Sequence, residues 1–142
     1  MTLQEKNKAI VTRFNKAFIE QGDVQAYQEI IAPHFINHSA PPGVPKGPEG
    51  VLYFFNEVLR PAFPDLSVEI LDMLAEGDKV VTHKLFHGTH EGSFMGVPAS
   101  HQTVEIDVID IVRLSQGKVV EHWNVMDLES VLARLNVHQG VF

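Results

Sequence analysis

The hydrophobic pattern changes its period near residue 66, and this change constrains the fold more than any other feature of the chain. Before it, apolar residues recur every three or four positions, which predicts helices over 3–21, 24–31 and 48–60. After it, apolar and polar residues alternate, which predicts strands over 67–75, 79–87, 102–114 and 118–126, and then a short helix over 128–135. Helices followed by an antiparallel meander indicate an α+β fold. The length of 142 residues suits one domain, so we expect residues 1–142 to fold as a single unit.

Charge and composition exclude several classes of function. The chain holds 11 Lys and Arg against 18 Asp and Glu, a net charge of −7, which makes nucleic acid and anionic membranes poor partners. It contains no cysteine, so thiol nucleophiles, disulfides and cysteine metal sites are excluded. Neither a signal peptide nor a membrane-spanning run is predicted. We therefore expect a cytoplasmic protein.

A single carboxylate interrupts an otherwise apolar strand face. Alternation places Asp110 on the same face as four apolar residues, which are Val104, Ile106, Val108 and Val112. A buried carboxylate is costly unless it is hydrogen-bonded or functional. Two interpretations stay open: a hydrogen-bonded structural residue, or a general base whose pKa is raised by burial.

The turn at residues 115–117 decides which residues lie beside Asp110. A two-residue turn would place Asp110 opposite Trp123, whereas a three-residue turn would place it opposite His122 and diagonal to Asn124. We favour the second register because it gathers Asp110, His122 and Asn124 on one face. His122 is then either a proton-transfer partner of Asp110 or a hydrogen-bonded sheet residue.

The remaining candidates lie in loops and helices. His83 and His87 share a strand face about 13 Å apart, too far to hold one ion, so no metal site is expected. His38 opens a proline-rich loop and is either a surface residue or a side chain at a cavity mouth. Candidates to line a substrate pocket, which would also suit an ordinary core, are Phe14, Phe18, Tyr53, Phe54, Phe94 and Met126.

Six short motifs follow one another in the order of a known family. They are Asn37-His38-Ser39, Gly47-Pro48-Glu49-Gly50, Phe63-Pro64-Asp65-Leu66, Glu76-Gly77-Asp78-Lys79-Val80-Val81, Gly88-Thr89-His90-Glu91-Gly92 and Gly117-Lys118-Val119-Val120-Glu121-His122-Trp123-Asn124. Over roughly residues 5–135, the chain resembles the SnoaL-like polyketide cyclases, or ester cyclases, of the nuclear-transport-factor-like superfamily.

The resemblance implies a fold, an activity and an assembly. The fold would be a cone in which a curved antiparallel sheet wraps around helices and leaves a deep apolar pocket. Characterised members close a ring by intramolecular aldol condensation without a metal or organic cofactor. They use an acidic residue as acid and base, with His and Asn side chains assisting at the enolate. The resemblance also implies a homodimer formed through the sheets.

The family pattern transfers only in part to this sequence. His38 matches the early pocket His, but Asn124 stands where the cyclases have their acid/base Asp, and Asp110 stands where they have a second pocket His. An amide does not transfer protons at neutral pH. One hypothesis is therefore an enzyme in which Asp110 removes a proton from an apolar keto compound for condensation or isomerisation. His38 or His122 would donate to the enolate oxygen, and Asn124 would add a hydrogen bond. The other is a non-catalytic small-molecule binding protein that kept the fold.

Overall fold

The N-terminal third of the chain is helical, as its period predicts. The computed structural model describes residues 1–137. The first helix, α1 (Leu3–Arg13), begins with a capping box between Thr2 and Glu5 and continues directly into a π-helical segment, η1 (Phe14–Glu20). Gly22, at φ +76°, ends this helix, and α2 (Val24–Ile30) follows. The wider turns of η1 are a local departure from the uninterrupted α-helix expected over 3–21.

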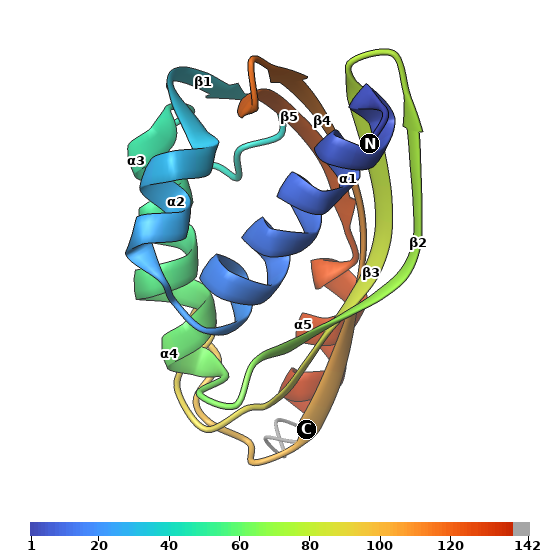
Figure 1. The fold of residues 1–142 in the computed structure, drawn as a ribbon. Helices are drawn as coiled ribbons and strands as arrows, with labels where there is room; N and C mark the ends of the chain where they lie inside the picture. The colour runs from blue at the N-terminus through green and yellow to red at the C-terminus, as the bar shows by residue number, and fades with distance from the viewer. Residues whose placement is uncertain (138–142) are drawn as a thin grey trace.

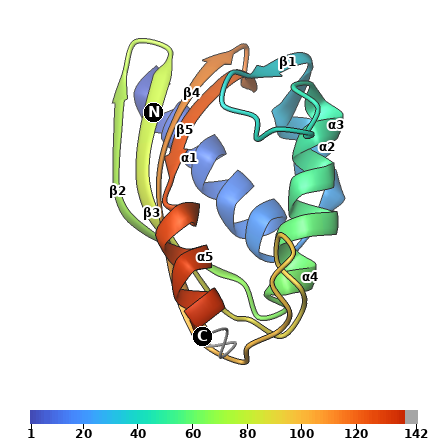
Figure 2. The same cartoon turned by 180° about the vertical axis from the view of Figure 1, so that it is seen from behind.

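A second helical run packs beside the first. It comprises α3 (Pro48–Tyr53), the π-helical η2 (Phe54–Leu59) and α4 (Arg60–Ala62), which together cover the predicted helix. Pro48 occupies the first turn, where its missing N–H costs nothing. The last helix, α5 (Leu128–Val137), lies at one end of the sheet (Figure 2).

The strands form one five-stranded sheet in the order β1-β5-β4-β3-β2. Their bounds are β1 (Ile31–Asn37), β2 (Ser67–Glu76), β3 (Lys79–Thr89), β4 (Thr103–Ser115) and β5 (Lys118–Met126). Strands β2 to β5 pair with one another in antiparallel order, whereas β1 pairs with β5 in parallel. The expected α+β class is confirmed, but the sheet is mixed rather than purely antiparallel. The long chain between β1 and β5 supplies the crossover that parallel pairing requires.

The sheet curves around the helices and encloses the core. Helix α1 lies between the sheet and helices α2 and α3 (Figures 1 and 2). Large side chains from both layers are fully buried between them, among them Phe18, Leu59, Phe63, Phe86 and Ile106. No helix within residues 1–137 is both long and apolar enough to cross a membrane.

The hairpin between β4 and β5 fixes the register of the site, and the predicted register is wrong. The turn has two residues, Gln116 and Gly117, both with positive φ. The pairing then skips Val120, so Asp110 lies opposite Asn124 and Val112 opposite His122. This β-bulge adds one residue to β5. It therefore restores the expected face, with Asp110, His122 and Asn124 together, although the turn is the shorter one.

Candidate functional site

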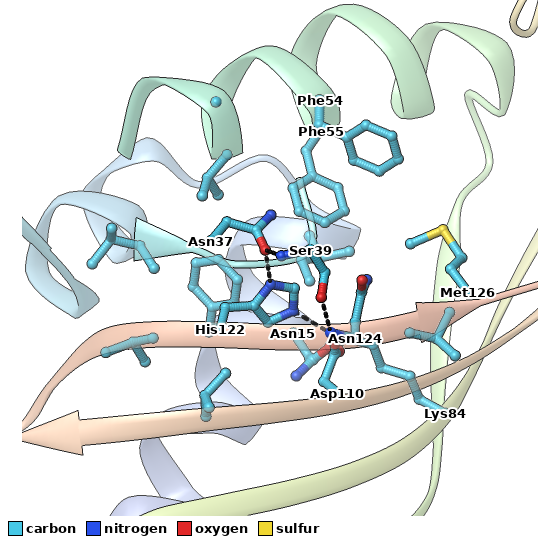
Figure 3. Close-up of a pocket in the computed structure, with 18 of the residues that line it drawn as sticks. Asn15, Asn37, Ser39, Phe54, Phe55, Lys84, Asp110, His122, Asn124 and Met126 are labelled. Atoms are coloured by element: carbon cyan, nitrogen blue, oxygen red, sulfur yellow. Dashed lines mark hydrogen bonds and ion pairs between the residues drawn. The ribbon is translucent and has the colours of Figure 1, made fainter. Parts of the chain in front are cut away.

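A cavity of about 430 Å³ lies between the helices and the inner face of the sheet (Figure 3). Its size falls within the range of small-molecule sites. Its wall is mainly apolar and includes Val11, Phe14, Phe54, Phe55, Phe86 and Met126. The polar side chains at its surface are Asn15, Asn37, Ser39, Lys84, Asp110, His122 and Asn124.

Five of these polar residues form one continuous chain of contacts, which we call the polar chain. Asn37 Oδ1 lies 2.8 Å from His122 Nδ1, and His122 Nε2 lies 2.7 Å from Asp110 Oδ1. The other carboxylate oxygen, Asp110 Oδ2, lies 2.5 Å from Lys84 Nζ, which also donates to Asn15 Oδ1 at 2.6 Å. Lys84 and Asp110 are buried. Residues from five elements, β1, β5, β4, β3 and η1, thus meet at one wall of the cavity (Figure 3).

The hydrogen-bond pattern assigns the protons on His122. The backbone N–H of Ser39 donates to Asn37 Oδ1 at 3.0 Å, and this fixes the oxygen of that amide as the acceptor. His122 Nδ1 must then donate to the same oxygen, while Nε2 faces a carboxylate oxygen that also accepts. An ionised Asp110 can only accept, so a single proton between Nε2 and Oδ1 satisfies both atoms.

The expected rise in the pKa of Asp110 is wrong. Burial alone raises the pKa of this carboxyl, but the Lys84 ammonium and the hydrogen bond and charge of His122 lower it by more. The net result is a pKa well below the usual range for aspartate. The carboxylate is therefore ionised at neutral pH and is a weak base by itself.

Asn124 offers a second polar group to the cavity. Its backbone N–H donates to Ser39 Oγ at 3.0 Å, which links β5 to the proline-rich loop. Within residues 1–137 its side-chain amide has no hydrogen-bond partner, and it lines the cavity next to Asp110 (Figure 3). This amide is free to bind a carbonyl or enolate oxygen of a ligand.

The structure places His38 outside the cavity. Its ring stacks on Trp123 at 4.8 Å between centroids, and Nε2 lies 2.8 Å from Glu121 Oε2. Glu121 also pairs with Arg113 at 2.5 Å, on the outer face of the sheet. Of the two interpretations of His38, the structure therefore agrees with a surface residue and not with a side chain at the cavity mouth. The alternation of β5 turns Trp123 and Glu121 outward, and His38 contacts both of them.

The predicted aromatic lining is half right. Phe14, Phe54 and Met126 line the cavity. Phe18 and Phe94 are instead fully buried in the core, and Tyr53 is 45% exposed on the outside of its helix. Helical and strand periodicity identifies apolar residues but does not separate those around a cavity from those in solid core.

Four residues of the site were not predicted from the sequence. Asn37 and Ser39 belong to a motif quoted for the family, but no role followed from it. Lys84 carried a readable signal, because alternation in β3 places it on the same face as Val80, Thr82 and Phe86, as anomalous as Asp110. Asn15 carried none, since a polar residue in an amphipathic helix is ordinary. Residues 1–137 contain no cluster of three His, Asp or Glu side chains placed to hold a metal ion.

The curved mixed sheet with helices on its inner face defines an α+β protein with a SnoaL-like fold, and known structures agree. A protein assigned as a SnoaL-like polyketide cyclase from Jannaschia sp. CCS1 superimposes with a TM-score of 0.84 at 28% identity, over 95% of this chain and 94% of that one. IdmH from Streptomyces antibioticus, assigned as a polyketide cyclase, gives 0.80 at 30% identity, over 92% and 98%. TsrD from Streptomyces laurentii gives 0.83 at 27% identity, over 95% and 98%.

The family profile agrees with the structural neighbours. The profile of the SnoaL-like polyketide cyclases matches residues 9–135, which is most of the chain. No curated protein matches the chain. The chain belongs to the SnoaL-like polyketide cyclase family.

Proposed function

We propose that this protein acts on a small, mainly apolar keto compound by acid/base chemistry carried out by its own side chains. The reaction class is intramolecular aldol condensation, as in polyketide cyclisation, or a related isomerisation. The observation that carries the proposal is the 2.7 Å contact between His122 Nε2 and Asp110 Oδ1 at the wall of the cavity. Family membership and the assigned polyketide cyclases among the similar structures support the substrate class.

The pair of His122 and Asp110 acts as one acid/base group. It donates the Nε2 proton to the carbonyl oxygen of the substrate, while the other ring proton stays on His122 Nδ1, which donates to Asn37 Oδ1. The α-carbon then loses a proton to the pair, and the electrons of that C–H bond form the enol. In the cyclisation, the enol carbon attacks a second carbonyl of the same molecule, the pair gives its proton to the oxygen of that carbonyl, and it takes back the O–H proton of the enol as the first carbonyl re-forms. In the isomerisation, the pair gives its proton to a different carbon of the conjugated enol and again takes back the O–H proton. Every proton that leaves the pair is thus replaced.

The amide of Asn124 supplies the second contact to the oxygen on which charge develops. It lies opposite Asp110 across the β4–β5 pairing and has no partner within residues 1–137 that it would have to leave. Donors aimed at a developing oxyanion typically contribute about 10²–10³ in rate. Asn124 thus assists the reaction without carrying a proton itself.

A second candidate function, ligand binding without catalysis, is favoured by one observation. Both oxygens of Asp110 and both ring nitrogens of His122 already have partners in the polar chain. In a binding protein these contacts would persist, and Asn124 would orient the ligand.

Proton exchange separates the two functions. 2-Tetralone, an apolar aromatic ketone, is dissolved in D₂O with the protein, and loss of the α-proton signal is followed by NMR. We expect His122→Gln and Asp110→Asn each to lower the exchange rate by about 10²–10⁴ while the Kd changes only a few-fold. His83→Gln, on the outer sheet face, is the matched control. Binding of the ketone by the wild-type protein without faster exchange would support the binding function.

We also propose a homodimer formed through the outer face of the sheet. Ile109 and Val125 lie opposite each other there and are 46% and 73% exposed. Trp123, the single tryptophan, neighbours Val125 on β5. Ile109→Glu should therefore halve the mass measured by light scattering, whereas Leu3→Glu on α1 should leave the mass unchanged. Dilution of the wild-type protein should shift the emission of Trp123. An unchanged mass in Ile109→Glu would place the interface elsewhere.

A further inference from the structure

The cavity contains a buried lysine, Lys84, to which the proposed reaction gives no role. Its side chain is 3% exposed, and its position on β3 faces the cavity (Figure 3). Lysine is seldom fully buried unless it is paired. Here Nζ contacts Asp110 Oδ2 at 2.5 Å and Asn15 Oδ1 at 2.6 Å, and it lies 5.1 Å from the centre of the Phe86 ring.

The contacts of Lys84 use it only as a hydrogen-bond donor. An ammonium has only donors, and its two partners in the polar chain are oxygen acceptors. Asn15 is fixed in this orientation because its amide nitrogen donates to the backbone carbonyl of Val11 at 2.9 Å. The side-chain oxygen of Asn15 therefore has to point toward Lys84.

The carboxylate of Asp110 is shared between two side chains. Its Oδ2 contacts Lys84, and its Oδ1 contacts His122. If the lysine charge were absent, the carboxylate would face a single cation in an apolar wall. The shared proton would then move from Nε2 to Asp110 Oδ1, because neutralising the pair removes two buried charges.

We propose that Lys84, held by Asn15, is a positioning residue that keeps Asp110 ionised and so keeps both ring nitrogens of His122 protonated. This inference deepens the proposed function and rests on it for its consequence in catalysis. Lys84 itself does not touch the atom that receives the proton. It determines where the proton of the pair resides before the substrate arrives.

Nitrogen NMR of the histidine side chain tests the proposal without any substrate. Protein labelled with ¹⁵N at histidine is compared with Lys84→Met, which removes charge and donors, and with Lys84→Gln, which keeps an N–H donor but removes the charge. Lys79→Met is the matched control, because Lys79 begins the same strand but lies exposed over Trp123 on the outer face. At pH 7 we expect two similar nitrogen shifts for His122, typical of imidazolium, in the wild-type protein and in the control Lys79→Met.

Both Lys84 variants should show the widely separated nitrogen shifts of a neutral ring protonated on Nδ1. If Lys84→Met does not fold, Lys84→Gln decides the question. Retention of the imidazolium signature in a folded Lys84 variant, or its absence from the wild-type protein, would overturn the proposal.

The exchange assay adds a functional readout. In Lys84→Gln, the pH at which exchange of 2-tetralone is half-maximal should move by one unit or more, while KM stays within about twofold. The pair consists of Asp110 from β4 and His122 from β5. The charged group that contacts it is Lys84 from β3, and the neutral side chains of Asn15 and Asn37 complete the polar chain. An unmoved profile beside a changed nitrogen spectrum would overturn the catalytic consequence. Absence of wild-type exchange would defeat the proposed function but leave the nitrogen spectra to decide the role of Lys84.

Discussion

Two carboxylates of strand β4 each pair with a histidine of a neighbouring strand at the same distance but in different surroundings. On the inner face, His122 lies 2.7 Å from Asp110, and on the outer face, His83 lies 2.7 Å from Asp107. The inner side chains are 19% and 11% exposed, and the outer ones are 40% and 60% exposed. The inner carboxylate also contacts the Lys84 ammonium, whereas the outer one is exposed at the surface. Distance therefore does not distinguish the two pairs, but burial and the third partner do.

The difference between the two faces has an energetic consequence. In water, solvent replaces much of what a lost partner provided, so exposed ion pairs contribute little to stability. In the interior, removal of one partner leaves the other charge without solvent or counter-ion. The inner pair should therefore tolerate substitution far less than the outer pair.

The largest expected effect is the loss of stability when Asp110 is removed. Asp110→Ala leaves the cations of Lys84 and His122 buried without their anion, and we expect the free energy of unfolding to fall by about 3–5 kcal/mol. Asp107→Ala should change it by less than about 1 kcal/mol. Urea denaturation followed by circular dichroism measures both. Equal losses in the two variants would show that the faces do not differ as described.

A smaller effect is expected in the acid dependence of stability. Burial raises the pKa of Asp110 in the folded protein, but Lys84 and His122 lower it by more, so the net pKa is below the usual value. The unfolded chain, with an aspartate pKa of about 3.9, therefore binds the proton more readily. The contribution of Asp110 is complete above about pH 4 and is lost as the pH falls toward its folded pKa.

Denaturation midpoints between pH 5 and pH 2 test this dependence. Asp110→Asn should lose less stability than the wild-type protein over this interval, because it lacks the carboxyl that must be protonated. Asp107→Asn is the matched control on the outer face and should keep the wild-type slope. A wild-type slope in Asp110→Asn would contradict the assignment.

The sequence predicted the elements well because their signals are local. The change of period near residue 66 predicted every antiparallel strand to within a few residues, and Gly22 and Pro48 marked helix boundaries. The two π-helical segments could not be predicted, since their apolar spacing resembles that of an α-helix over one or two turns. The parallel pairing of β1 depends on contacts between residues about 85 positions apart, as from Asn37 to His122, which no local pattern encodes.

The candidate site was predicted in its centre and missed at its edges. Alternation predicted that His122 and Asn124 share one face of β5, but that this face joins Asp110 depends on the register. The prediction of a three-residue turn reached the correct face because a bulge at Val120, which no local pattern indicates, compensates for the shorter turn. The predicted rise in the pKa of Asp110 considered burial but not Lys84, whose position in β3 shows the same anomaly. His38 was misplaced because the residues after a strand end have no alternation to follow.

The smallest expected effect tests whether the inner face tolerates polar groups only when they are satisfied. Thr82 lies opposite Asp110 in the β3–β4 pairing and is fully buried, yet its hydroxyl has no hydrogen-bond partner within residues 1–137. Thr82→Val replaces that hydroxyl by a methyl group of similar size, and we expect the free energy of unfolding to rise by about 1 kcal/mol. Thr103→Val, at an exposed position of β4, should change it by less than about 0.5 kcal/mol. A loss of stability in Thr82→Val would mean that the hydroxyl serves the polar chain, and the inner face would then depend on one more residue than the contacts described above.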